Sequence, residues 1–315
     1  MKFLMKKGAT AAIATAAVLA MTAGSALAGA TFTINPGAIP GAVITSPFNA
    51  NFINGISSEL LHQNAANTGF GTAAGQTGFV QFGSFKNSNG NVLPFISGLG
   101  IDYGLYLKFN IAATYTGGGT GNGSLGSNYA VTQLDFTVYA DPGSPNSGPP
   151  NNGYTSANAA AAGGGQEATV TNTTDDIVIG IGSLVSGVAV INALGGASIN
   201  SIENFAVCNG VGTASSGATI ISAPSCNGSF GSAFFAAPVP FYNIAFTEFN
   251  NTLTGISRGT GLDGRPTIGI TDASGGVTFA GTVPEPGSMV LLGLALAGLG
   301  ISSRRNKNKD AKAAA

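Results

Sequence analysis

Histidine, the side chain best suited to proton transfer near neutral pH, occurs once in this 315-residue chain, as His62. A Ser-His-Asp hydrolase would have to be built on this one residue. No serine elbow and no paired acids accompany it in the sequence. A zinc site with three histidines is excluded by the count. We therefore expect His62 to be an exposed polar residue at the end of a strand, and we assign no catalytic residue.

Aspartates at three places could supply oxygen ligands to a calcium ion. Asp175 and Asp176 are adjacent, while Asp141 and Asp263 stand beside glycine and proline. Carboxylate and backbone oxygens are the ligands that calcium takes in proteins. The spacing fits neither an EF-hand loop nor the repeats of an RTX protein. We therefore assign no metal site and keep a calcium-assisted site as an alternative.

Tyrosine rings on a sheet surface offer a second binding chemistry, because their apolar faces can stack on sugar rings. Most such rings are ordinary sheet-surface aromatics, and the chain contains no tryptophan, which argues against a dedicated lectin cleft. The candidate tyrosines for such stacking are Tyr103, Tyr106, Tyr139 and Tyr154.

Two glycine motifs have the G-x-G-x-x-G spacing of dinucleotide-binding loops, at residues 121–126 and 259–264. In a dinucleotide site this motif follows a parallel strand and opens a helix. Neither copy has that context, and 49 glycines make chance matches common. We expect no cofactor.

The elements that would position these residues are strands. Leu105, Leu107, Phe109 and Ile111 alternate with polar residues, which predicts a half-buried strand within 103–115. Residues 133–140 repeat the alternation, and the glycine-rich residues 117–126 between the two favour a long hairpin. Residues 141–165 contain four prolines, an alanine run and three consecutive glycines, which predicts a mobile surface loop that packs poorly.

A buried strand is predicted downstream at residues 177–181, and a strand pair over 234–249. Residues 184–191 are rich in valine and isoleucine, which argues against a helix there. The pattern at residues 268–270 and 277–279 predicts two strands joined by a turn at 272–276. Together with a short strand near residue 32, these predict an all-β fold. The architecture we expect is a Gly/Asn/Ser-rich sandwich or open barrel.

The ends of the chain carry targeting segments. Lys2, Lys6 and Lys7 precede an uncharged stretch, and small residues at Ala26 and Ala28 predict signal-peptidase cleavage after residue 28. Near the other end, Val283, Pro284, Glu285 and Pro286 precede an uncharged run of glycine, leucine and alanine. Residues 287–303 would form a single transmembrane helix, and the cationic residues after it, Arg304 and Arg305 first, should stay cytoplasmic.

This C-terminal arrangement resembles the PEP-CTERM sorting signal of Gram-negative envelope proteins. The resemblance implies recognition and cleavage by an exosortase, a membrane enzyme of strains that make exopolysaccharide. Short fragments of the central region also resemble PEP-CTERM proteins associated with flocculation: residues 31–41, 54–59, 103–106 and 134–142. That second resemblance implies a role in holding cells together in exopolysaccharide flocs.

Removing both targeting segments leaves an exported region with four cations and eleven anions, a net charge of −7. A surface without a basic patch argues against nucleic-acid binding. Export also places Cys208 and Cys226, the chain's two cysteines, in an oxidising compartment, which predicts a disulfide bond. Two free buried thiols or half of a metal site are the alternatives, and no histidine lies nearby to complete such a site.

The domain organisation expected is a signal peptide at 1–28, an exported β-rich domain at 29–282, a sorting signal at 283–305 and a basic cytoplasmic tail at 306–315. The protein would be exported, transiently anchored, and released to the cell surface or extracellular matrix. Its expected partners are signal peptidase, the exosortase, the membrane and the exopolysaccharide. The function we favour is a non-enzymatic matrix protein of flocs or biofilms. The alternatives are a carbohydrate-binding module with a defined site and a secreted polysaccharide-modifying enzyme.

Overall fold

Antiparallel strands dominate the computed structural model, which describes residues 29–143, 150–193, 195–251 and 256–280. The expected signal peptide, sorting signal, transmembrane segment and basic tail lie outside these residues. Within them, no helix has the length and apolar character needed to cross a membrane. The all-β class predicted from the alternating sequence is confirmed.

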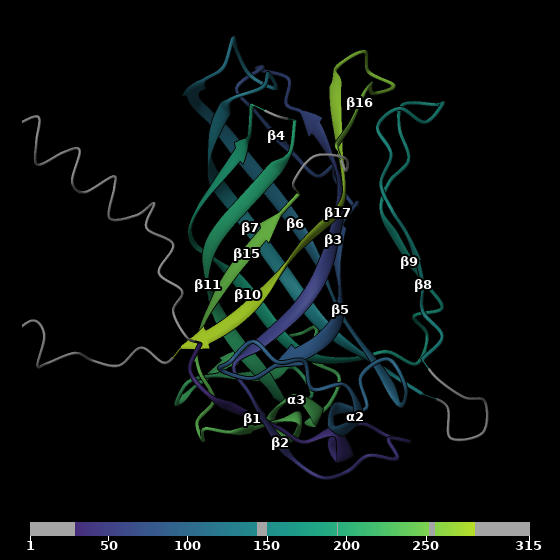
Figure 1. Ribbon diagram of the computed structural model, residues 1–315, viewed down its shortest axis with the longest axis vertical. Coiled ribbons are helices and arrows are strands. Elements are labelled where there is room, and N and C mark those ends of the chain that lie inside the picture. The colour runs from purple at the N-terminus through teal and green to yellow at the C-terminus, as the bar shows by residue number, and fades with distance from the viewer. Residues whose placement is uncertain (1–28, 144–149, 194, 252–255, 281–315) are drawn as a thin grey trace, which may run out of the picture. The chain divides into compact units, whose positions relative to one another are not determined.

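The main sheet closes on itself into a barrel (Figure 1). Going around it, the strands follow the order β10-β7-β6-β5-β3-β17-β15-β11, and β11 pairs again with β10. A closed sheet leaves no edge strand around the ring. The bounds are β3 Phe52–Gln63, β5 Gly78–Lys86, β6 Tyr103–Gly118, β7 Ser127–Pro142, β10 Ile177–Ile191, β11 Ala197–Gly210, β15 Ile244–Asn250 and β17 Pro266–Ala280.

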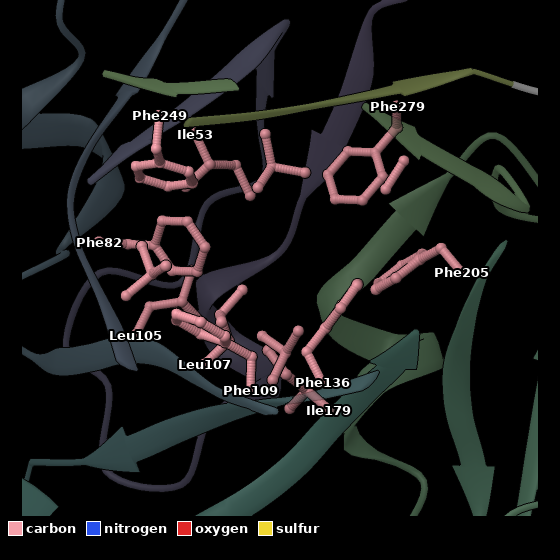
Figure 2. Close-up of a cluster of buried hydrophobic side chains, with 14 of the residues drawn as sticks. Ile53, Phe82, Leu105, Leu107, Phe109, Phe136, Ile179, Phe205, Phe249 and Phe279 are labelled. Carbon is pink, nitrogen blue, oxygen red and sulfur yellow. The ribbon is translucent and has the colours of Figure 1, made fainter. Parts of the chain in front are cut away.

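Apolar side chains from every side of this ring fill the barrel interior. Figure 2 shows residues of β3, β5, β6, β7, β10, β11, β15 and β17 converging on one core. Phe205 belongs to this core, and its ring centroid lies 6.4 Å from that of Phe136 and 4.9 Å from that of Phe279. The interior is thus packed with side chains, and the cavities found among them include two of about 60 and 40 Å³ and a smaller one of about 10 Å³ beside Phe205.

The hairpin predicted around residues 117–126 is confirmed. β6 and β7 pair along their whole length, from Tyr103 opposite Pro142 to Gly118 opposite Ser127. The inward face of β6 carries Leu105, Leu107, Phe109 and Ile111, as its alternation predicted.

The turn predicted at residues 272–276 is wrong. β17 runs through this region as one strand, with an irregular register between Ile270 and Ala273 where Asp272 adopts a φ of 54°. The extra residue bends the strand without reversing it, as a β-bulge does. Gly275 and Gly276 serve close packing here, since an added Cβ would lie 1.8 Å from the Glu248 carbonyl oxygen and 2.1 Å from that of Ile53.

Residues 150–176, which we name the outer hairpin, also depart from the sequence-based expectation. The loop predicted at 141–165 was expected to pack poorly, yet Ala157 and Ala159 are buried against Leu60 and Phe79 on the outside of the barrel. An added Cβ on Gly259 would lie 1.7 Å from the Ala159 carbonyl oxygen, so glycine allows this close approach. The outer hairpin contains β8 Gly153–Thr155 and β9 Thr169–Thr171, drawn in teal beside the barrel in Figure 1.

Short elements complete the domain. β1, β2, α2 and α3 gather at the lower end of the barrel in Figure 1. β14 pairs with β1 in a separate three-stranded sheet, and β12, β13 and β16 extend the main sheet. Their bounds are β1 Phe32–Ile34, a 3-10 turn Pro36–Ala38, β2 Phe48–Ala50, β4 Gly69–Gly71, α2 Pro94–Ser97, β12 Thr213–Ser216, β13 Thr219–Ser222, α3 Phe230–Phe234, β14 Phe235–Ala237 and β16 Ile256–Thr260.

Candidate functional site

Three aspartates meet where β7 ends and β10 begins. The two strands are antiparallel, and their ladder begins with Ile177 opposite Ala140. Asp176 directly precedes Ile177, and Asp141 directly follows Ala140. The strand register therefore brings these two side chains together. Asp175 joins them, and carboxylate oxygens of all three lie within 4.8 Å of one another. Asp263 does not take part, because it pairs with Arg265 in the turn between β16 and β17, at 3.4 Å.

Asn152, at the start of the outer hairpin, binds two members of this aspartate cluster. Its backbone N–H donates to Asp141 Oδ2 at 3.0 Å, and its side-chain amide donates to Asp176 Oδ1 at 3.3 Å. Asp141 is fully buried, and its Oδ1 has no hydrogen-bond partner in the described structure. Asn152 Oδ1 is likewise buried and unpartnered among the described residues. The cluster therefore contains oxygen atoms with unused acceptor capacity.

Burial raises the pKa of Asp141 and of Asp176 above the ordinary aspartate value. Loss of hydration is the main cause, and the charges of the neighbouring aspartates add to it. Hydrogen bonds from Asn152 oppose the rise at both residues, and the Tyr106 hydroxyl opposes it further at Asp176. Net negative charge is therefore costly at this position.

A group of three tyrosines lies beside the aspartates. Tyr106 and Tyr139 stack with ring centroids 5.0 Å apart, and Tyr154 of the outer hairpin meets Tyr106 edge-on at 6.0 Å. The Tyr106 hydroxyl donates a hydrogen bond to Asp176 Oδ2. Burial raises the pKa of each of the three phenols. The Lys108 ammonium lies 5.9 and 5.8 Å from the Tyr106 and Tyr139 ring centroids.

Two of the four candidate tyrosines for sugar stacking are not exposed. Tyr103 and Tyr106 are both 0% exposed. Tyr103 packs among core residues against Phe234, and Tyr106 is on the outer face of β6 beneath Tyr154. Tyr103 shares the inward face of β6 with Leu105 and Leu107, so its burial follows from the alternation itself. Tyr106 is on the opposite face, and the alternation could not foresee the second layer that covers it. Tyr139 and Tyr154 are half-buried, so their rings remain partly accessible.

His62 connects the outer hairpin to the barrel. It lies near the end of β3, as expected, but its Nε2 is 3.0 Å from Glu167 Oε1 and both side chains are 25% exposed. It is thus more enclosed than the exposed residue we expected. Nearby, the Ala157 N–H donates to Ser58 Oγ at 2.9 Å, and Ser58 Oγ donates to the Ile270 carbonyl at 3.0 Å. The His62–Glu167 contact and the Ala157–Ser58 hydrogen bond both join β3 to the outer hairpin.

Two buried glutamates are titratable groups that the sequence motifs did not single out. Glu59 and Glu203 are 6% and 0% exposed, and each has one carboxylate oxygen without a hydrogen-bond partner in the described structure. Thr247 Oγ1 donates a hydrogen bond to Glu203 Oε2 at 2.9 Å. Glu59 borders the two larger interior cavities, those of about 60 and 40 Å³. Loss of hydration raises the pKa of Glu59 to about 8 and that of Glu203 to about 7. The sequence could have indicated their burial, because each glutamate occupies an alternate position of its strand that otherwise carries inward-facing residues.

Cys208 and Cys226 form a disulfide bond, with Cα atoms 5.5 Å apart. Both are buried in a small cluster with Val178, Ala206 and Ala214, beside the β12–β13 hairpin.

Replacing both cysteines with alanine should lower the free energy of unfolding by about 3 kcal/mol, the chain-entropy value for a loop of this separation, 18 residues. Urea unfolding of the two proteins would measure the loss. Reducing the unaltered protein should reproduce most of it. Equal stability of the double variant and the parent would contradict the prediction.

The two G-x-G-x-x-G segments occupy antiparallel connections. Residues 121–126 lie between β6 and β7, and residues 259–264 span the end of β16 and the turn to β17. Neither opens a helix, so neither has the structural context in which this motif binds a dinucleotide.

The comparison with protein families identifies one segment of the chain. Residues 282–305 match the model of the PEP-CTERM protein-sorting motif, and they include the predicted residues Val283, Pro284, Glu285, Pro286, Arg304 and Arg305. Neither the curated proteins nor the solved structures include a match to the chain. The protein therefore carries a PEP-CTERM sorting motif, which implies export and membrane-anchored sorting by an exosortase in a Gram-negative bacterium.

Proposed function

We propose that this protein is a non-enzymatic component of the cell surface or extracellular matrix that acts in exopolysaccharide-dependent floc or biofilm formation. The sorting motif at residues 282–305 carries the proposal, because it implies processing by an exosortase. Exosortase sorting is associated with strains that make exopolysaccharide, as the PEP-CTERM resemblance implies. The exported region would then meet hydrated polysaccharide as it leaves the membrane.

The composition of the exported region supports this role. Charged residues make up 8% of the chain, and the region between the targeting segments has a net charge of −7. Exposed asparagine, serine and threonine side chains must therefore supply most of its contacts with water. The same groups form many weak hydrogen bonds with sugar hydroxyls, and they do so without a defined cleft.

A carbohydrate-binding module with one defined site is the second candidate. The partly accessible rings of Tyr139 and Tyr154 beside the aspartate cluster favour it. Calorimetry with the producer's own polysaccharide separates the two. A saturable isotherm of fixed stoichiometry supports the defined site, and weak non-saturating heats support the diffuse mode.

The processing step provides the direct test. Mass spectrometry of the protein from producer cells should show a C-terminus near Pro284 when the exosortase is present. The segment containing Arg304 and Arg305 should persist when the exosortase gene is deleted. Persistence of that segment in both strains would contradict sorting.

A matched variant tests the enzymatic alternative that would rely on the chain's one histidine. His62→Gln removes the one imidazole but keeps a polar side chain beside Glu167. In a strain lacking the native gene, this variant should restore floc or biofilm formation as fully as the parent. Failure to restore it, with normal export and stability, would favour the polysaccharide-modifying enzyme instead.

A further inference from the structure

We propose that Asp141, Asp175 and Asp176, together with Asn152, bind one calcium ion on the outer face of the barrel. The proposal stands on the geometry of this cluster and does not depend on the matrix function. A bound cation would interact with acceptor oxygens that have no hydrogen-bond partner in the described fold.

The spacing of the carboxylates suits one ion. Oxygens of the three aspartates lie within 4.8 Å of one another. Two ligands on opposite sides of a calcium ion are about 4.6–5.2 Å apart, because each Ca–O distance is about 2.3–2.6 Å. The cluster is therefore small enough for all three residues to coordinate the same ion.

Unpartnered buried oxygens are the independent indication of a ligand. Asp141 is 0% exposed, and its Oδ1 has no hydrogen-bond partner in the described residues, although its Oδ2 accepts from Asn152. A buried acceptor without a partner is costly, and native structures seldom leave one unexplained. Asn152 Oδ1 is a second buried acceptor without a partner in the described residues, on the side chain whose amide donates to Asp176. A cation in the cluster would give the Asp141 oxygen a partner.

The charge balance favours a divalent cation over a neutral ligand. Three carboxylates converge here, and the ion pairs found in the described residues, His62 with Glu167 and Arg265 with Asp263, do not involve them. The nearby Lys108 ammonium lies over the rings of Tyr106 and Tyr139.

Calcium suits this ligand set better than magnesium. Calcium accepts six to eight oxygens in irregular geometry, whereas magnesium requires a near-ideal octahedron at about 2.0–2.1 Å. The ligands come from two parts of the chain, the end of β7 and the two ends of the outer hairpin, so no single element fixes their geometry. Asp175 is exposed, so water can occupy the remaining positions on that side.

Binding would also fasten the outer hairpin to the barrel. Asn152 stands at the start of that segment, Asp175 and Asp176 stand at its end, and Asp141 belongs to β7. One ion would therefore connect both ends of the outer hairpin to the same strand. Calcium should consequently slow proteolysis within residues 150–176.

Terbium luminescence and calcium titration test the site directly. The protein is purified from producer cells and stripped of metal with EDTA. The chain has seven tyrosines and no tryptophan, and Tyr106 donates a hydrogen bond to Asp176. Terbium bound there should therefore luminesce on tyrosine excitation, and calcium should displace it. We expect a calcium Kd of about 10⁻⁴–10⁻³ M, as in other extracellular modules, and far weaker binding of magnesium.

Variants locate the binding. Asp175→Asn and Asp141→Asn each remove one charged ligand and should weaken calcium binding about tenfold or more. Asp135→Asn is the matched control, because Asp135 is an exposed acid on the same strand β7, and it should leave binding unchanged. Asp175 is exposed, so its variant keeps the test valid if Asp141→Asn does not fold. Absence of saturable calcium binding, or equal binding by Asp175→Asn and the parent, would overturn the proposal.

Discussion

Replacing Glu59 with glutamine is expected to make the protein more stable at pH 8 by about 4 kcal/mol while leaving its stability near pH 4 almost unchanged. The pKa of Glu59 rises from 4.5 to about 8 in the folded protein. Between these two values the folded state holds a proton that the unfolded state has released. Stability then falls by about 1.4 kcal/mol per pH unit.

The sign of this effect follows from burial. The carboxylate form of Glu59 is disfavoured because the interior removes its hydration, and the hydrogen bond from Ser57 only partly opposes this. The full stability is therefore present below about pH 4.5, and part of it is lost as the pH rises from there through the folded-state pKa of about 8. Among the residues that line the two larger interior cavities, Glu59 is the one charged side chain, and Tyr129 is the one further titratable side chain. Glutamine resembles the protonated acid and cannot ionise.

Glu203 should act in the same direction over a narrower range. Its pKa rises to about 7, so ionisation should cost about 3 kcal/mol by pH 8. Thr247 Oγ1 donates a hydrogen bond to its Oε2, and this bond and the neighbouring Ser201 side chain moderate the rise in pKa. Because Glu203→Gln removes a separate group, its effect should add to that of Glu59→Gln if the two carboxyls do not interact.

Urea unfolding between pH 4 and pH 8 measures both effects. EDTA should be present throughout, so that metal binding at the aspartate cluster does not contribute. Glu248→Gln is the control, because Glu248 is exposed on β15 and should leave the pH dependence unchanged. The result that would contradict this expectation is a Glu59→Gln protein whose stability falls with pH as steeply as that of the parent.

Local patterns predicted the strands more successfully than they predicted what surrounds them. The alternation at 105–111 and 134–140 correctly indicated the β6–β7 hairpin, because a half-buried strand shows its two faces in its own sequence. The covering of the outer face by residues 150–176 depends on a contact between distant segments. Alanines and glycines in that segment looked like linker sequence, although Ala157 and Ala159 are small because they pack closely.

The same distinction applies to the candidate site. Adjacent Asp175 and Asp176 were visible as potential ligands, but their meeting with Asp141 depends on the register between β7 and β10. No local pattern contains that register. Asp263 precedes a glycine and was also a candidate ligand, but it lies elsewhere, in the turn where it pairs with Arg265. Closure of the ring likewise depends on a long-range contact, the pairing of β17 with β3, two strands from opposite ends of the domain. The resulting sheet is a closed barrel, whereas the sequence left a sandwich and an open barrel as alternatives.

The second large effect is expected from Phe205→Ala, which should lower the free energy of unfolding by about 3–5 kcal/mol. Phe205 is 1% exposed and contacts rings from four other parts of the chain. Besides Phe136 and Phe279 in the barrel wall, its ring meets Phe235 at 5.6 Å and Phe241 at 6.0 Å. The side chain therefore joins the barrel wall to β14 and the segment that follows it, and its removal would leave a cavity among rigid neighbours.

Two further variants separate packing from simple hydrophobicity. Phe205→Leu keeps an apolar side chain of smaller volume and should lose less stability than Phe205→Ala. Leu262→Ala removes an apolar side chain that is 89% exposed, so it should change stability by less than about 0.5 kcal/mol. Urea unfolding at one fixed pH measures all three. A cavity inside a packed core cannot be filled without moving several strands, so Phe205→Ala should lose far more stability than Leu262→Ala. Equal losses of unfolding free energy would show that the barrel interior is not the packed core that holds these strands together.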